Sequence, residues 1–168
     1  DLSSVSVDGV TVPETDAQEA DGTGLVLVTQ GGSIDGLTVS NTTADALVIQ
    51  GSDDLTDNSL TLTNVTIQHD TPSATNAVNL TRDNVSVTAL NVSGTANGLL
   101  VNNASNTSVA NGYFYNLSGS GISVTADADE TGLTVSDSVF VAINDDAIST
   151  VDNVSAVNLS NNIFTQAA

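Results

Sequence analysis

The stretch VANGYF at residues 109–114 shows the pattern that decides the fold: an aliphatic residue first, a turn-forming residue third, and an aliphatic or aromatic residue sixth. VSDSVF at 135–140 and LSNNIF at 159–164 repeat this pattern toward the C-terminus. The earlier copies are VTALNV at 87–92, LTNVTI at 62–67, IDGLTV at 34–39 and VDGVTV at 7–12. The seven copies begin 22 to 28 residues apart. Such variable spacing favours a coil with loops of different length over the fixed period of helical repeats.

The third place of the pattern holds Gly, Asn or Asp in every copy but one, and these residues adopt the left-handed backbone region at low cost. We therefore expect a sharp bend between two strands there, with Ala89 as the departure. The residues at this place are Gly9, Gly36, Asn64, Ala89, Asn111, Asp137 and Asn161. The first and sixth places are always apolar, which predicts inward-facing side chains. At the sixth place, Phe114, Phe140 and Phe164 should stack inside the coil.

A second segment recurs between these copies, and each example begins with a small residue. These small residues are Gly24, Ala46, Ala77, Gly98, Gly121 and Ala147. Apolar residues usually follow at the second and fourth places, which is the alternation of a strand with one buried face. A third strand leads into each bend, so each repeat contains about three short strands. The small residues should line one tight corner of the coil.

The pattern of aliphatic, Asn or Gly, and aliphatic or aromatic residues covers nearly the whole chain and resembles the pectate-lyase-like right-handed parallel β-helix repeat family. The resemblance implies no single activity, because that fold carries lyases, hydrolases, epimerases, adhesins and phage spikes. We expect an all-β, right-handed single-stranded parallel β-helix of about seven rungs of roughly 25 residues, as one domain over residues 1–168. A β-sandwich also has many short strands, but it does not need seven copies of one pattern.

Charge restricts the partners of the chain. Twenty acidic residues stand against a single Lys or Arg, for a formal net charge of −19. Such a charge repels nucleic acid and anionic lipid, and no apolar stretch is long enough to span a bilayer. Carboxylates without lysine suit a high-salt or divalent-rich medium, as in halophilic or marine organisms. Cysteine and methionine are absent, so we expect a mature chain or an excised part of a larger protein that is secreted or displayed on a cell surface.

An apolar outer surface is predicted near the C-terminal copies of the pattern. Tyr113, Val139 and Ile163 occupy the outward fifth place, while Tyr115 and Val141 lie one place past the inward Phe residues. Contiguous exposed apolar side chains usually mark an interface. The alternative is that a neighbouring loop covers them. Neither end of the sequence shows a helix or charged plug, so we expect self-association or flanking domains at the open ends of the coil.

Catalytic residues are sparse. NDDAI at 144–148 resembles the paired-Asp segment of polygalacturonases, in which two carboxylates act as acid and base. No Gly-His-Gly and no basic pair accompany Asp145 and Asp146. Arg82 is the only candidate base for a lyase of this fold, and we expect Asp83 to pair with it on the surface. His69 is expected to be exposed in a loop. The sequence therefore predicts a protein that is not an enzyme.

Calcium is the one candidate cofactor, because it takes oxygen ligands from clustered carboxylates. The candidate ligands are Asp53, Asp54, Asp57, Asp127 and Asp129. None of their loops has EF-hand spacing, so solvated acidic turns are the alternative. Ten sequons permit N-glycosylation of a secreted chain. They begin at Asn41, Asn64, Asn79, Asn84, Asn91, Asn103, Asn106, Asn116, Asn153 and Asn158.

Two functions are compatible with these features. The first is a non-catalytic extracellular structural or adhesive module that self-assembles or serves as a rigid spacer. The alternative is a carbohydrate-binding or carbohydrate-processing β-helix that uses Asp145 and Asp146, with Tyr113 and Tyr115 stacking against sugar rings.

Overall fold

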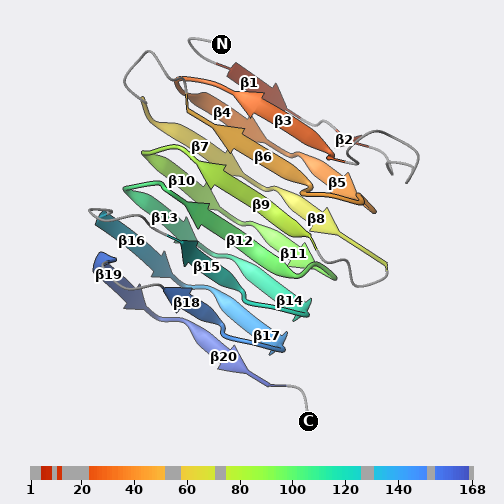
Figure 1. Cartoon of the computed structure of the whole chain (residues 1–168), viewed down its shortest axis with the longest axis vertical. Helices are drawn as coiled ribbons and strands as arrows, with labels where there is room; N and C mark the ends of the chain where they lie inside the picture. The colour runs from red at the N-terminus through yellow and green to blue at the C-terminus, as the bar shows by residue number, and fades with distance from the viewer. Residues whose placement is uncertain are drawn as a thin grey trace.

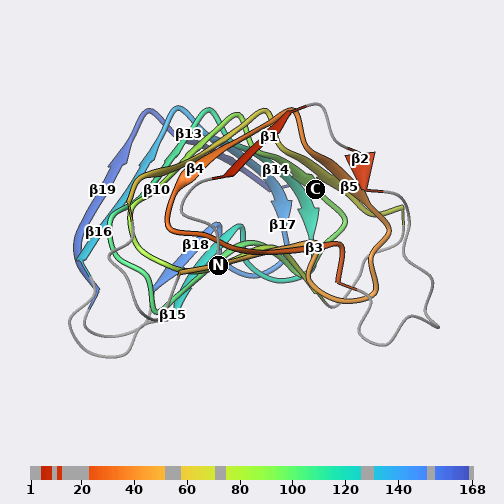
Figure 2. The same cartoon turned by 90° about the horizontal axis from the view of Figure 1, so that it is seen from above.

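The computed structural model describes residues 5–8, 11–12, 23–51, 58–70, 75–125, 131–150 and 154–166. Their strands form three parallel sheets, and no helix occurs within these ranges. The strands of each sheet follow one another from the N-terminal to the C-terminal end of a column (Figure 1). Seen along the column, the chain traces the same rounded outline turn after turn (Figure 2). The prediction of an all-β parallel coil is confirmed.

The first sheet consists of β1 (Val5–Asp8), β4 (Gly32–Asp35), β7 (Leu60–Thr63), β10 (Val85–Thr88), β13 (Thr107–Ala110), β16 (Thr131–Ser136) and β19 (Ser155–Ser160). The second consists of β2 (Thr11–Val12), β5 (Thr38–Ser40), β8 (Thr66–Gln68), β11 (Asn91–Ser93), β14 (Tyr113–Leu117), β17 (Val139–Ile143) and β20 (Ile163–Thr165). The third consists of β3 (Leu25–Val28), β6 (Leu47–Gln50), β9 (Asn76–Thr81), β12 (Asn97–Asn102), β15 (Ile122–Thr125) and β18 (Ile148–Thr150).

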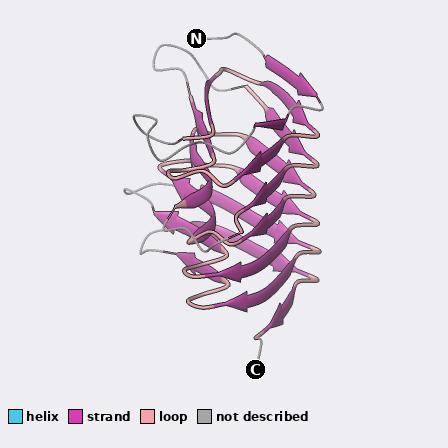
Figure 3. Cartoon of the chain, turned by 90° about the vertical axis from the view of Figure 1, so that its right-hand side faces the viewer, coloured by secondary structure: helices cyan, strands magenta, loops and turns pink. Residues whose placement is uncertain are grey.

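Each turn of the coil contributes one strand to each sheet, and the turns stack as separate layers (Figure 3). Five turns are complete and described throughout their strands, from β4–β6 to β16–β18. The first turn, β1–β3, is described only in parts, and the last contains only β19 and β20. The predicted count of seven rungs was therefore slightly too high, because two copies of the pattern lie in these end turns.

The core is the set of inward positions that the repeat predicts. Val87 at the first place pairs with Leu62 and Val109 of the neighbouring turns, and all three are buried. The three Phe residues also stack as predicted. The ring centroids of Phe114 and Phe140 are 4.8 Å apart, and those of Phe140 and Phe164 are 5.3 Å apart. These separations follow the spacing of about 4.8 Å between paired strands, so the backbone register sets the aromatic stack.

The predicted bends are left-handed at every described position. The φ angles are 71° at Gly36, 52° at Asn64, 55° at Ala89, 54° at Asn111, 51° at Asp137 and 54° at Asn161. Gly9 lies outside the described residues. Ala89 adopts the same conformation as its neighbours, although a Cβ atom there costs roughly 1–2 kcal/mol. The stacking of turns thus imposes the bend even where the local residue opposes it.

The small residues form the predicted corner at the start of the third sheet. A Cβ atom added to Gly121 would lie 2.5 Å from the carbonyl oxygen of Ala147 and 2.6 Å from Cδ1 of Phe140. At Gly98 a Cβ atom would overlap the ring of Phe114 and the carbonyl of Gly121. Glycine is therefore required at these two positions, because the Phe ring of the following turn occupies the space.

Side-chain amides connect successive turns beside this corner. Nδ2 of Asn76 donates to Oδ1 of Asp45 at 2.9 Å, and Nδ2 of Asn97 donates to Oδ1 of Asn76 at 2.9 Å. Oδ1 of Asn97 then accepts from the backbone N–H of Ser120 at 2.9 Å. Each amide both donates and accepts along the column, so the ladder satisfies polar groups that lie partly buried between the turns.

The strain at Ala89 yields a stability prediction. We expect Ala89→Gly to stabilise the fold by about 0.5–1 kcal/mol, because removal of the Cβ atom relieves the left-handed conformation by more than glycine costs in entropy. The matched control is Ala110→Gly, which lies in the extended strand β13 and should destabilise by a similar amount. Denaturant unfolding of both variants measures the difference. Equal destabilisation by the two substitutions would contradict the proposed strain.

Candidate functional site

The five predicted interface residues lie together on the outer face of the second sheet. Tyr113, Val139 and Ile163 are direct register neighbours on β14, β17 and β20, and Tyr115 pairs with Val141. We call these five residues the outer apolar patch. Tyr113, Tyr115 and Ile163 are exposed, and the two tyrosine rings stack with centroids 6.4 Å apart. The structure therefore brings the predicted residues into one contiguous surface that reaches the last described turn.

A second apolar surface lies at the C-terminal end of the column. Val157, Leu159 and Phe164 pair with Leu133, Val135 and Phe140. Those partners are buried, whereas Leu159 is 51% and Phe164 52% exposed because no further turn lies over them among the described residues. We call Val157, Leu159 and Phe164 the C-terminal face. Residues 154–166 contain no charged side chain.

The C-terminal face was not predicted as an exposed surface. The repeat pattern assigned Phe164 to the interior, and its ring does stack on Phe140. An inward-facing side chain is buried only where one turn of the coil lies before it and another lies after it. Lack of charge at 154–166 did not signal this exposure, because residues 84–126 in the middle of the column also carry no charge.

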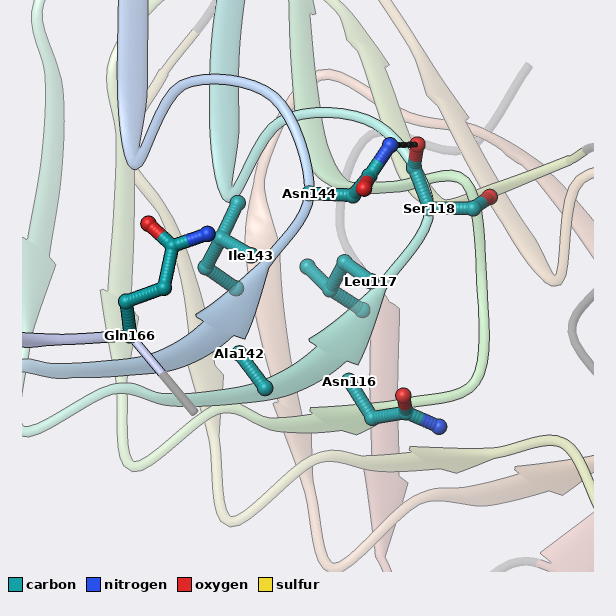
Figure 4. A pocket seen from close by; sticks show the side chains of 7 residues that line it. All are labelled: Asn116, Leu117, Ser118, Ala142, Ile143, Asn144 and Gln166. Carbon is teal, nitrogen blue, oxygen red and sulfur yellow. Dashed lines mark hydrogen bonds between the residues drawn. The ribbon is translucent and has the colours of Figure 1, made fainter. Parts of the chain in front are cut away.

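A pocket of about 470 Å³ opens beside the ends of β14 and β17 (Figure 4). Its lining residues are Asn116, Leu117, Ser118, Ala142, Ile143, Asn144 and Gln166. Leu117 and Ile143 are buried, and Nδ2 of Asn144 donates to the carbonyl oxygen of Ser118 at 3.3 Å. The lining thus combines two aliphatic side chains with uncharged amides.

The predicted acidic sites are only partly described. Asp145 and Asp146 are exposed and lie in the turn before β18, where Asp146 O accepts from Gly121 N at 2.9 Å. This backbone contact serves the small-residue corner. Asp145 also lines a smaller pocket of about 240 Å³ with Phe140 and Phe164.

The five candidate calcium ligands, Asp53, Asp54, Asp57, Asp127 and Asp129, lie outside the described residues. Within the described ranges, no group of three or more His, Asp or Glu side chains could hold a metal ion. Calcium binding therefore stays a prediction.

Arg82 is not the surface residue that we expected. It is 2% exposed, and its guanidinium donates to backbone carbonyls of three successive turns at the corner between the third and first sheets. Nη1 donates to Thr29 O at 2.7 Å, and Nη2 donates to Gln30 O at 3.1 Å and to Asn58 O. Nε donates to Asp83 O at 3.1 Å. The planar fork of five donors suits such a cluster of carbonyls. Sequence reasoning missed this role because the carbonyls belong to distant residues.

The contacts of Arg82 predict that lysine cannot replace it. We expect Arg82→Lys to lower the free energy of unfolding by about 2–3 kcal/mol, since one ammonium cannot reach carbonyls of three turns and some buried acceptors lose their donor. Denaturant unfolding measures this change. A loss below about 0.5 kcal/mol, the size of an ordinary surface substitution, would show that the guanidinium contacts contribute little.

His69 is also buried, at 6% exposure, contrary to the expectation of an exposed loop histidine. Its Nε2 lies 3.3 Å from Oγ1 of Thr42 in the preceding turn. Burial lowers the pKa of His69 below its ordinary value of 6.5, and the neighbouring Asp70 carboxylate opposes this effect. The side chain is therefore held in its neutral form inside the coil at pH 7.

The lowered pKa of His69 predicts a pH-dependent stability. The unfolded chain binds the proton more readily than the folded chain, so the contribution of His69 is complete above pH 6.5 and is lost as the pH falls toward the lowered folded pKa. We expect wild type to lose stability relative to His69→Gln below pH 6.5, by at most about 1.4 kcal/mol per pH unit. Unfolding curves at several pH values measure this difference. Parallel stability curves for the two proteins would contradict it.

The described sequons differ in the surroundings of their Asn side chains. Asn41 is held at both amide atoms by Asp70, at 3.1 and 3.0 Å, and Nδ2 of Asn79 donates to Asp45 at 2.9 Å. Nδ2 of Asn64 donates to Asp35, and Nδ2 of Asn106 donates to Asn84. Four others are exposed and have no side-chain hydrogen bond within the described residues: Asn91, Asn103, Asn116 and Asn158. Asn153 lies outside the described residues.

Residues 23–168 match the family model described as the right-handed beta helix region. The chain therefore belongs to the right-handed β-helix family, which confirms the resemblance found in the repeat pattern at the level of the fold. No curated protein and no solved structure matches the chain. Among the described residues there is no helix of the length and hydrophobicity needed to cross a membrane.

Proposed function

We propose that this β-helix is a non-catalytic extracellular module with a structural or adhesive role, and that it associates end to end with a second copy through the C-terminal face. The observation that supports this proposal is the apolar, uncharged character of β19 and β20, where Ile163 continues the outer apolar patch of Tyr113 and Val139. Proteins usually place charged residues or Pro on strands that must not pair with another chain. β19 and β20 contain neither.

The lack of charge at residues 154–166 is compatible with contact to a second copy. The chain carries a net charge of −19, so two copies repel each other wherever their acidic residues approach. An end-to-end contact places uncharged residues 154–166 of both copies between the acidic columns. The outer apolar patch adjoins this face through Ile163, beside Phe164 in β20, and enlarges the apolar area available for contact. High salt should strengthen the association because it screens the remaining repulsion.

Light scattering over a range of protein and salt concentrations tests this proposal. We expect a mass that rises from 16.9 kDa toward twice that value, and more readily at high salt. Leu159→Asp should keep the protein monomeric, because it places two carboxylates in the contact. The control Ser33→Asp adds the same charge at an exposed position of β4 and should leave the association unchanged. Circular dichroism verifies that both variants are folded.

Two results would overturn this proposal. A wild-type mass of 16.9 kDa at every concentration would exclude self-association of this chain. Loss of association in Tyr113→Ser but not in Leu159→Asp would move the contact from the C-terminal face to the outer apolar patch.

A second candidate is binding or processing of carbohydrate. The adjacent exposed carboxylates of Asp145 and Asp146, with the exposed pair Tyr113 and Tyr115 on β14, support it. Two carboxylates can act as acid and base on a glycosidic bond. Turnover of an acidic polysaccharide that is lost in Asp145→Asn or Asp146→Asn would favour this function. No turnover by the wild type would leave the structural role.

A further inference from the structure

The folded chain can accommodate an N-linked glycan only at an Asn whose amide nitrogen is open to solvent, because the sugar replaces one amide hydrogen. The buried Oδ1 of Asn79 has no hydrogen-bond partner among the described residues, and its Nδ2 is bound to Asp45. A sugar at Asn79 would have to enter the space between turns. Asn41, Asn64 and Asn106 use Nδ2 in contacts with neighbouring turns, and Oδ1 of Asn84 accepts one of them. These five sequons therefore serve the ladders that connect the turns.

Backbone conformation separates the four exposed sequons whose amides are unengaged. Asn91 is the first residue of β11 and Asn158 lies within β19, so both are in extended, paired segments. Asn103 and Asn116 are left-handed, with φ of 57° and 53°, and project at the bends that follow β12 and interrupt β14. Glycosylated asparagines belong to surface turns. Among the sequons that the structure describes, only Asn103 and Asn116 combine an exposed side chain, an unengaged amide and a bend.

We propose that Asn103 and Asn116 are the N-glycosylation sites among the described sequons. Asn103 follows β12 of the third sheet and Asn116 lies in β14 of the second, so the glycans would extend from different sides of the column. Asn116 is among the residues that line the 470 Å³ pocket, and its side chain extends away from those of Asn144 and Gln166 (Figure 4). Neither site belongs to the C-terminal face, and the glycans leave that face free.

This inference rests on the extracellular part of the proposed function and not on self-association. The full chain is secreted from a eukaryotic host that attaches N-linked glycans, and glycopeptides are mapped by mass spectrometry. We expect modification at Asn103 and Asn116. Ser105→Ala and Ser118→Ala remove one sequon each while they keep the asparagine that forms the bend, and each should remove the mass of one glycan. Thr81→Ala removes the sequon of Asn79 and should leave the mass unchanged.

Three results would overturn the assignment. They are a secreted chain without any glycan, a glycan at Asn79 or Asn41, and equal occupancy at Asn91 and Asn158. The host supplies the complete glycosylation machinery. A secreted chain without any glycan would therefore count against the two sites themselves. Light scattering of the same preparation reports end-to-end association separately. A glycosylated monomer would therefore contradict the proposed function without affecting the glycan sites.

Discussion

Parallel stacking places each residue of the coil directly on the equivalent residue of the preceding turn, about 4.8 Å away. This constraint explains why one six-residue pattern recurs through the chain. An inward Val, Leu or Phe finds an apolar neighbour above and below it only if the pattern is kept, as in the column from Leu62 through Val87 to Val109. The bends obey the same constraint, since Ala89 accepts a left-handed φ of 55° between two asparagines. Local preference is secondary to the match between turns.

Stacking of equivalent residues also creates an electrostatic difficulty for an acidic chain, because carboxylates at equivalent positions would repel each other. The ladders avoid this by placing an amide beside a carboxylate. Asn64 donates to Asp35, Asn76 to Asp45 and Asn161 to Asp137, at 2.9, 2.9 and 3.2 Å. An amide can both accept and donate, so it satisfies the carboxylate on one side and continues the ladder on the other. The abundance of asparagine in this sequence follows from that chemistry.

Most of the fold could be predicted from the sequence. Stacked turns require similar residues at the inward positions, at the bends and at the small-residue corner, so these residues recur once in every turn. The outer apolar patch could be predicted for the same reason, as alternation determines which residues of β14 and β17 face outward. The roles of Arg82 and His69 could not be predicted from the sequence. Each depends on groups that the winding of the chain brings close, such as the carbonyl of Thr29 and the hydroxyl of Thr42. The exposure of Phe164 was missed because the repeat pattern shows that a side chain points inward but does not show whether another turn covers it.

The hydrogen bonds between turns run along the column, from each strand to its equivalent in the next turn. A force that pulls on the two ends therefore loads these bonds lengthwise, and it breaks the bonds of the outermost strand one after another. Because each turn contacts mainly its neighbours, the loss of one turn exposes the next without disturbing those beyond it. Under tension such a column yields by peeling from an end, turn by turn, and each detached turn releases more than twenty residues of slack.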